Sequence, residues 1–232
     1  MFQKTRGILL KKTKLANGGL VLKFYTEEFG VKSFIGRSSK KAKNTFLPLS
    51  IASFSAYANP KNQLNNIKDY ETEYSLREIY QDIYKSNILI FLNEILNHVI
   101  QEEEKNSNKF NYLITSILEL ETKPLSVNFH LIFLMRFTAY LGLDPDMESK
   151  GKYFDYAEGE IKSFIPTHVH FFDENETLLF KHLHELAFDE SISAQFTNQS
   201  RKKALQLIVT YYRYHTDMRE LKSLPVLETV FG

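Results

Sequence analysis

Apolar and polar residues alternate with a period of two along the first third of the chain. Leu20, Leu22 and Phe24 form one apolar row within such a stretch, and this alternation is typical of strands with one buried face. Turn-forming residues, among them Gly18 and Pro60, separate the alternating stretches. The pattern predicts five short, mostly antiparallel strands, in the ranges 5–12, 20–26, 31–36, 46–57 and 63–70.

These strands suit a small closed barrel of the oligonucleotide-binding (OB) type. An SH3-like barrel would have the same periodicity, so spacing alone leaves that alternative open. We expect a barrel domain at residues 1–70.

The apolar spacing changes after residue 70 to between three and four, which predicts amphipathic helices. The stretch 125–141 is apolar nearly all round, as expected of a central buried helix. It stops at Gly142, with Pro145 just beyond, a usual pairing at a helix end. Further helical spacing covers the ranges 84–99, 110–120, 177–188, 199–215 and 224–231.

Residues 144–172 are the least regular part of the chain and contain Gly151 and Gly159. We expect a loop-rich insertion there, with two short strands around Tyr153 and Ile161. The predicted fold class is therefore α+β, with a five-stranded OB-type barrel at 1–70 and a mainly helical domain at 71–232.

Charge is distributed very unevenly, although the net charge of the whole chain is only +1. Residues 1–68 carry 13 of the 29 Lys and Arg residues, against only Glu27 and Glu28 among the 28 acidic residues. A locally basic domain attracts polyanions whatever the balance of the whole chain. The barrel is thus expected to bind a polyanion, and the alternative is a basic, solvated surface without a partner.

The stretch 37–44 gathers four cations, namely Arg37, Lys40, Lys41 and Lys43. Cations at this density neutralise phosphates and release their counterions. Tyr25 is the aromatic residue we expect to stack on bases, because its hydroxyl tolerates exposure. The basic surface is extended by further cations on the strands: Lys4, Arg6, Lys11, Lys12, Lys14, Lys23 and Lys32.

Signals for catalysis are weak. The chain has no cysteine, which excludes disulfides, thiolate metal sites and cysteine nucleophiles. Glu119, Glu121 and Lys123 resemble half of a metal-dependent nuclease site, but a solvated helix end explains them better. No nucleophile elbow or phosphate-binding glycine loop occurs. We expect no enzyme activity and no cofactor.

Four histidines invite a zinc interpretation: His168, His170, His182 and His184. Residues two positions apart on a helix point to different faces, and no thiolate is present to complete a structural site. No metal is therefore expected. The apolar stretch 127–143 is interrupted by His130 and Arg136, so we expect neither a membrane span nor a signal peptide, and a cytoplasmic location.

Four phrases, taken in order and spacing, resemble the RecO family of bacterial DNA repair proteins. They are residues 3–10 (QKTRGILL), 24–30 (FYTEEFG), 211–215 (YYRYH) and 219–227 (RELKSLPVL). The resemblance implies an OB barrel and a helical domain that act in recombinational repair through the RecF pathway. It also implies binding of single- and double-stranded DNA, strand annealing, association with RecR and the single-stranded DNA-binding protein SSB, and indirect help in loading RecA.

Residue by residue, the resemblance places DNA contacts best at Arg37, Lys40, Lys41 and Lys43. It places Arg136 near a pocket for the acidic SSB tail. It also implies an association with the nucleoid. Many relatives have four cysteines in a zinc-binding insertion that this chain lacks, so the insertion must be held by aromatic packing instead, from Tyr153, Phe154, Tyr156, Phe164 and Phe171.

A function of another class remains open from the residues alone. The chain could be a helical interaction scaffold whose basic barrel docks an acidic protein or RNA, with DNA binding incidental. Charge reversal at Lys40, Lys41 and Lys43 would discriminate between the two, because only the repair function predicts a loss of strand annealing.

Overall fold

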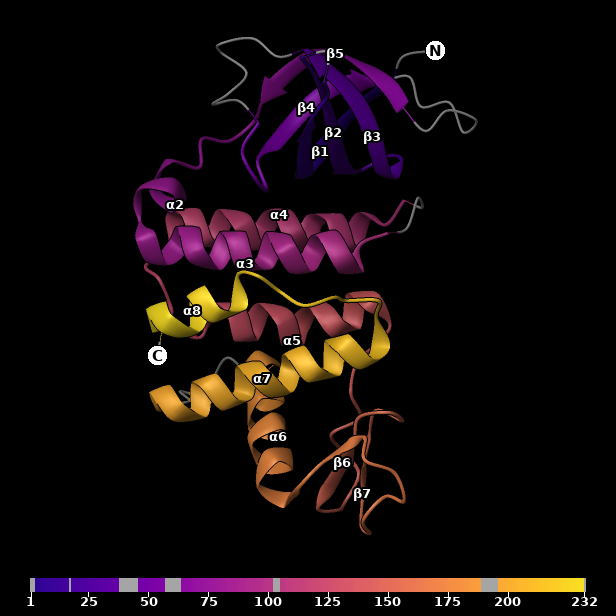
Figure 1. Ribbon diagram of the computed structural model, residues 1–232, viewed down its shortest axis with the longest axis vertical. Coiled ribbons are helices and arrows are strands. Elements are labelled where there is room, and N and C mark those ends of the chain that lie inside the picture. Colours follow the sequence, from indigo (N-terminus) through magenta and orange to yellow (C-terminus); the bar gives the residue numbers. More distant parts are fainter. Residues whose placement is uncertain are drawn as a thin grey trace. The chain divides into compact units, whose positions relative to one another are not determined.

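Five strands close into a barrel at the N-terminal end of the chain (Figure 1). Each strand pairs with its neighbours in the order β1-β2-β3-β5-β4, and β3 and β5 form the one parallel pair of the barrel. This confirms the five-stranded OB-type barrel and its mostly antiparallel pairing. The strands are β1 (Gln3–Lys14), β2 (Gly19–Thr26), β3 (Gly30–Arg37), β4 (Ile51–Ala56) and β5 (Leu64–Thr72).

The computed structural model describes residues 3–16, 18–37, 46–56, 64–101, 105–188 and 196–231. The chain divides into two compact units, Met1–Pro124 and Leu125–Gly232. None of the helices in the described ranges is both long and apolar enough to cross a membrane.

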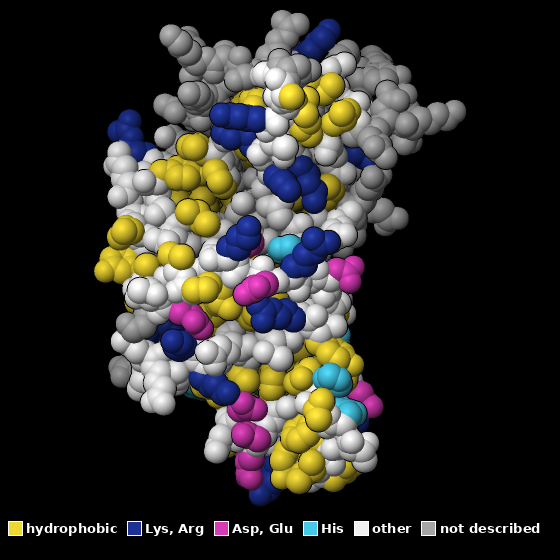
Figure 2. Space-filling model, viewed as in Figure 1, with side chains coloured by type: hydrophobic (Ala, Val, Ile, Leu, Met, Phe, Trp, Pro, Cys, Tyr) yellow, Lys and Arg dark blue, Asp and Glu magenta, His cyan; other side chains and the backbone are white. Residues whose placement is uncertain are grey.

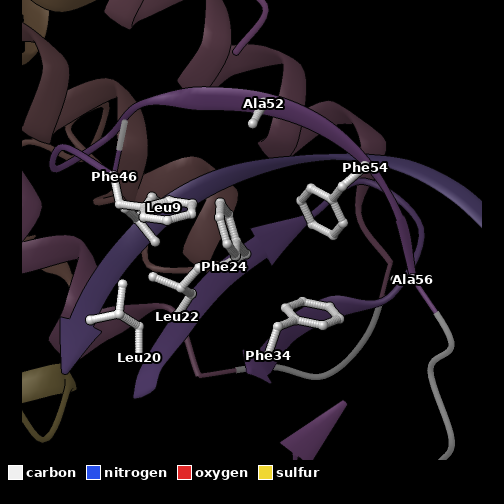
Figure 3. Close-up of a cluster of buried hydrophobic side chains, with 9 residues drawn as sticks. All are labelled: Leu9, Leu20, Leu22, Phe24, Phe34, Phe46, Ala52, Phe54 and Ala56. Carbon is white, nitrogen blue, oxygen red and sulfur yellow. The ribbon is translucent and has the colours of Figure 1, made fainter. Parts of the chain in front are cut away.

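Phenylalanine rings fill the barrel, and those of Phe24, Phe34, Phe46 and Phe54 belong to its buried core (Figure 3). The Phe24 ring lies 5.0 Å from that of Phe54 and 6.1 Å from that of Phe34, measured between centroids. A Cβ atom at Gly7 would approach the Phe54 ring to 2.9 Å, so the glycine makes room for this packing. The predicted inward row of β2 is therefore observed, with Leu20, Leu22 and Phe24 at 3% exposure or less.

Three described helices complete the first unit: α2 (Arg77–Gln81), α3 (Ile83–Val99) and α4 (Ser107–Thr122). The Asp82 carboxylate begins α3 by accepting from the N–H groups of Tyr84 and Lys85, a usual helix cap. Helix α3 packs against β1, and the Asn97 amide donates to the Leu10 carbonyl at 2.6 Å.

The second unit combines helices with a small sheet in the order β7-β6-β8. Gly142 follows α5 in the left-handed region, with φ of 70°, so the predicted helix end is confirmed. The insertion contains the two expected strands and one more. The elements are α5 (Phe129–Leu141), β6 (Tyr153–Asp155), β7 (Glu160–Lys162), β8 (Phe171–Phe172), α6 (Glu174–Phe188), α7 (Asn198–His215) and α8 (Leu224–Phe231).

Aromatic packing does hold the insertion, with one exception. Phe154 is fully buried and its ring lies 5.0 Å from that of Phe180 and 5.8 Å from that of Tyr211. Phe164, in contrast, is 63% exposed. The expectation for Phe164 was wrong because it lies in the loop after β7 rather than on a strand.

The predicted strand at 46–57 is shorter than expected. Residues before Ile51 form a turn in which the Ser50 N–H donates to the Leu47 carbonyl at 3.1 Å. Pro48 lies in this turn and has no N–H to donate to a strand ladder, so an apolar run that reads as one strand is divided into a turn and β4.

Candidate nucleic-acid interface

The barrel has an exposed outer face formed by parts of β1, β2, β3 and β5. Because Leu22 and Phe34 point inward, the residues alternating with them point outward. The strand register places these outward residues side by side. We call this surface the basic face, and it consists of Lys11, Thr13, Val21, Lys23, Ser33, Ile35, Leu64 and Asn66.

Two lysines oppose each other on the basic face. A bulge between Leu9 and Lys11 shifts the register of β1, so that Lys11 pairs directly with Lys23 of β2. A bulge of this kind reverses the alternation of side chains. Strict alternation would have turned Lys11 inward, next to Leu9.

Opposed like charges on neighbouring strands destabilise each other. The pKa of Lys23 is lowered, first by burial and then by the nearby charge of Lys11. An anion bound at both ammonium groups would remove this repulsion. The Lys11–Lys23 pair is therefore a point on the described barrel where the register suits a phosphate.

Aliphatic side chains adjoin the two lysines. Ile35 is 41% exposed and Leu64 is 44% exposed, and Val21 lies opposite Ile35. Figure 2 shows basic and apolar side chains next to one another over the barrel. A mixed surface of this kind can contact both the phosphates and the bases of a nucleic acid.

The other predicted cations of the strands lie elsewhere on the barrel. Lys12 pairs with Leu22 and therefore lies in line with the inward row. It is nevertheless exposed, because it lies near the end of β1. Lys14 lies opposite Leu20 in the same row and is also exposed. Lys4 is exposed beside β4, opposite Ser55.

Lys32 is half-buried and lies opposite Phe24 of β2. It follows that the predicted cations do not form one continuous strip on the described barrel.

Arg6 is engaged in an internal ion pair. Its guanidinium donates two hydrogen bonds to Glu27, both at 2.9 Å, and lies 5.4 Å from the centre of the Phe110 ring. The hydrogen bond to Glu27 raises the pKa of Arg6, and the same bond lowers that of Glu27. We therefore assign Arg6 to the packing of the first unit and not to the basic face.

The expectation that Tyr25 stacks on bases was wrong. Its side chain is 1% exposed, its ring lies 5.9 Å from that of Phe110 in α4, and its hydroxyl donates to the Asn106 carbonyl at 3.3 Å. Although Tyr25 points outward from the barrel, α4 covers this part of the surface. The basic face begins beyond the covered region.

The predicted contact loop follows β3. The backbone of Arg37 pairs with that of Gly19 at the end of this strand. The side chain of Arg37 and the residues Lys40, Lys41 and Lys43 lie outside the described residues. The loop leaves the barrel two residues after Ile35 of the basic face.

The candidate nuclease carboxylates have structural partners. Glu121 accepts from the N–H groups of Glu78 and Ile79, at 3.0 and 2.9 Å, and thereby caps α2. Glu119 pairs with Lys123 at 2.6 Å. These contacts tie Glu121 to the start of a helix, a role that does not follow from its sequence context.

Lys85 is a second structural residue whose role was not predicted from the sequence. It is 8% exposed, and its ammonium donates to the carbonyls of Glu121 and Lys123, at 3.1 and 2.9 Å. A buried cation thus closes the C-terminal end of α4, where the helix dipole favours positive charge. Its position on an apolar helix face three residues before Ile88 was the available signal.

In the second unit, the Arg136 Nε donates to the Ala187 carbonyl of α6. Its side chain is half-buried. This contact joins α5 to α6, and the role of Arg136 at the SSB tail stays a prediction.

The histidines are not gathered into one site. His168 lies 3.1 Å from the buried Asp155 carboxylate, and the His170 N–H donates to the His168 ring. His182 and His184 lie on α6, and the His182 ring lies 3.9 Å from the Glu185 carboxylate. Within the described ranges, no three His, Asp or Glu side chains are placed to hold a metal ion.

Comparison with known proteins gives two family models that match the chain. The model described as Recombination protein O N terminal matches residues 1–76, and that described as Recombination protein O C terminal matches residues 80–225. Similar curated proteins, each named DNA repair protein RecO, come from Flavobacterium psychrophilum, Flavobacterium johnsoniae and Phocaeicola vulgatus. Their identities are 37%, 36% and 36%, and the alignments cover 99%, 99% and 100% of both chains.

Proposed function

Because this chain belongs to the RecO family and has a role in DNA repair and recombination, we propose that it is a recombination mediator that binds DNA through the basic face. In this proposal it binds single- and double-stranded DNA and anneals complementary strands. With RecR, it helps to load RecA on SSB-coated DNA. Its place of action would be the cytoplasm, at the nucleoid.

The observation that carries this proposal is the opposed pair Lys11–Lys23 on an exposed, partly apolar surface. Two cations on neighbouring strands suit the regular phosphates of a nucleic acid better than a single acidic side chain. These lysines would contact phosphates and not base edges, so the binding would not depend on the nucleotide sequence. The loop residues Arg37, Lys40, Lys41 and Lys43 would extend the contact from the end of β3.

Annealing follows from weak, mobile contacts of this kind. Lysine is a flexible point charge, and binding two strands by their phosphates lowers their mutual repulsion. Complementary bases can then pair while the backbones remain held. The protein would supply charge and proximity, and no covalent chemistry.

We assign the recruitment of partners to the second unit. The acidic SSB tail would bind near Arg136, which contacts α6 through Ala187. RecR would also bind this chain while the chain is bound to DNA. Substitution of Arg136 by Gln should weaken binding of an SSB-tail peptide and leave the affinity for naked DNA unchanged.

The test replaces both lysines of the pair with glutamine and measures binding of single-stranded DNA across a salt series. Each phosphate contact on a single strand contributes about −0.7 to the slope of log K against log salt. The double variant Lys11→Gln with Lys23→Gln should therefore bind more weakly and with a shallower slope. A slope equal to that of the wild type would exclude the basic face.

A matched control replaces two exposed lysines of the second unit, Lys150 and Lys202, with glutamine. This variant has the same change in net charge, so the salt slope should stay as in the wild type. Charge reversal at Lys40, Lys41 and Lys43 provides the second arm. Unchanged annealing together with the loss of an acidic protein partner or of RNA binding would favour the scaffold function instead.

A further inference from the structure

The first unit contains a pocket that the strand pattern does not predict. It has a volume of about 290 Å³ and lies between the end of β5, the turn before β4 and helix α2. Ligand pockets in proteins begin at about this size. It is lined by Leu47, Ser50, Thr72, Tyr74, Ser75, Leu76, Arg77, Tyr80 and Gln81.

Apolar and aromatic groups form part of the lining. Leu47 and Leu76 supply aliphatic surface, and Tyr74 is 37% exposed. The Tyr80 hydroxyl donates to the Pro48 carbonyl, which fixes its ring beside the turn. Burial, and then the nearby Glu121, raise the pKa of Tyr80, so this hydroxyl stays neutral.

Polar groups supply the rest of the lining. Ser75 and Gln81 are exposed and carry a hydroxyl and an amide, which can serve both donors and acceptors of a ligand. Arg77 is the cation among the nine lining residues, and none of the nine is acidic. The nearby carboxylate of Glu121 is held by the backbone of α2. This composition favours a ligand with a flat, partly polar group and a negative charge.

The pocket adjoins the strand that carries the basic face. The Leu9 N–H donates to the Ser50 carbonyl at 3.0 Å, and the Leu49 N–H donates to the Leu9 carbonyl at 2.8 Å. Lys11 follows two residues later, roughly 7 Å along a strand. A nucleic acid strand bound at Lys11 can therefore bring a neighbouring nucleotide to the pocket.

We propose that this pocket binds one unpaired nucleobase of single-stranded DNA, with the ring against Tyr74 and the adjoining phosphate at Arg77. The proposal rests on the proposed function, since it requires DNA on the basic face. A base within a duplex is paired and stacked, so it cannot enter. The pocket would thus bind single strands and lose its contact with the base when the strands pair. The annealed product would then be held by its phosphates alone.

The experiment compares two labelled single strands of equal length and charge, oligothymidine and an abasic oligonucleotide, by fluorescence anisotropy. Stacking of a base on an aromatic side chain contributes about tenfold in affinity. The wild type should prefer the strand that carries bases. The variant Tyr74→Ala should lose about tenfold of this preference, with its affinity for the abasic strand and for duplex unchanged.

The matched control is Tyr84→Ala, which removes an exposed tyrosine of the same unit outside the pocket and should keep the full preference. A second readout uses a strand with 2-aminopurine, whose fluorescence should be quenched by wild type and Tyr84→Ala but less by Tyr74→Ala. Full preference in Tyr74→Ala would overturn the pocket assignment, as would a wild type without any preference. A wild type that binds neither strand would instead refute the proposed function.

Discussion

The buried ammonium of Lys85 allows a quantitative test of how the first unit is held together. Replacement by methionine keeps a side chain of similar length but removes the charge and two hydrogen bonds, to the carbonyls of Glu121 and Lys123. Hydrogen bonds that involve a charged group contribute about 1.5–3 kcal/mol each. The variant does not have to bury an ammonium, and this offsets part of the lost hydrogen-bond energy. We therefore expect a net decrease of about 2 kcal/mol in the free energy of unfolding.

The assay is urea unfolding followed by far-UV circular dichroism, since the chain has no tryptophan. The midpoint should fall while the dependence on urea stays the same, as expected of a change in stability alone. The control is Lys123→Met, because this side chain is 67% exposed and pairs with Glu119 at the surface. Such surface pairs contribute at most about 1 kcal/mol. Equal midpoints for Lys85→Met and the wild type would refute the capping role.

Two further predictions concern the second unit. Burial, and then the charge of Arg201, lower the pKa of His130 to about 3, so the unfolded chain takes up a proton at this residue before the folded one does. Stability should therefore fall as the pH decreases from about 6.5 to about 3, and His130→Leu should have a weaker pH dependence of its urea midpoint over that range. Gly142→Ala should cost about 1 kcal/mol, because φ is 70° there; an unchanged urea midpoint would contradict this reasoning.

The sequence pattern predicted the barrel well because strands depend on local alternation. The inward row of β2 and the helix end at Gly142 were both readable from neighbouring residues. The direction of Lys11 was not, since it depends on a bulge that alternation cannot reveal. The burial of Tyr25 could not be predicted either, because Phe110, which covers it, lies far along the chain.

Functional residues were predictable only in part. A count of cations located the basic barrel, but it could not separate Lys23 on an exposed face from Arg6 in an ion pair with Glu27. The role of Glu121 depends on the start of α2, which was not predicted. Residue type therefore indicated the kind of ligand, and the strand register indicated which side chains can meet it.

Helices cover one part of the barrel surface and leave the basic face exposed, and this difference determines where the protein can be truncated. Ile8, Tyr25 and Val31 point away from the barrel interior and are at most 9% exposed, with α3 against β1 and Phe110 of α4 against Tyr25. A fragment ending after β5 would leave this apolar surface exposed to water and prone to aggregation. A usable DNA-binding fragment should continue to Pro124, where the first compact unit ends.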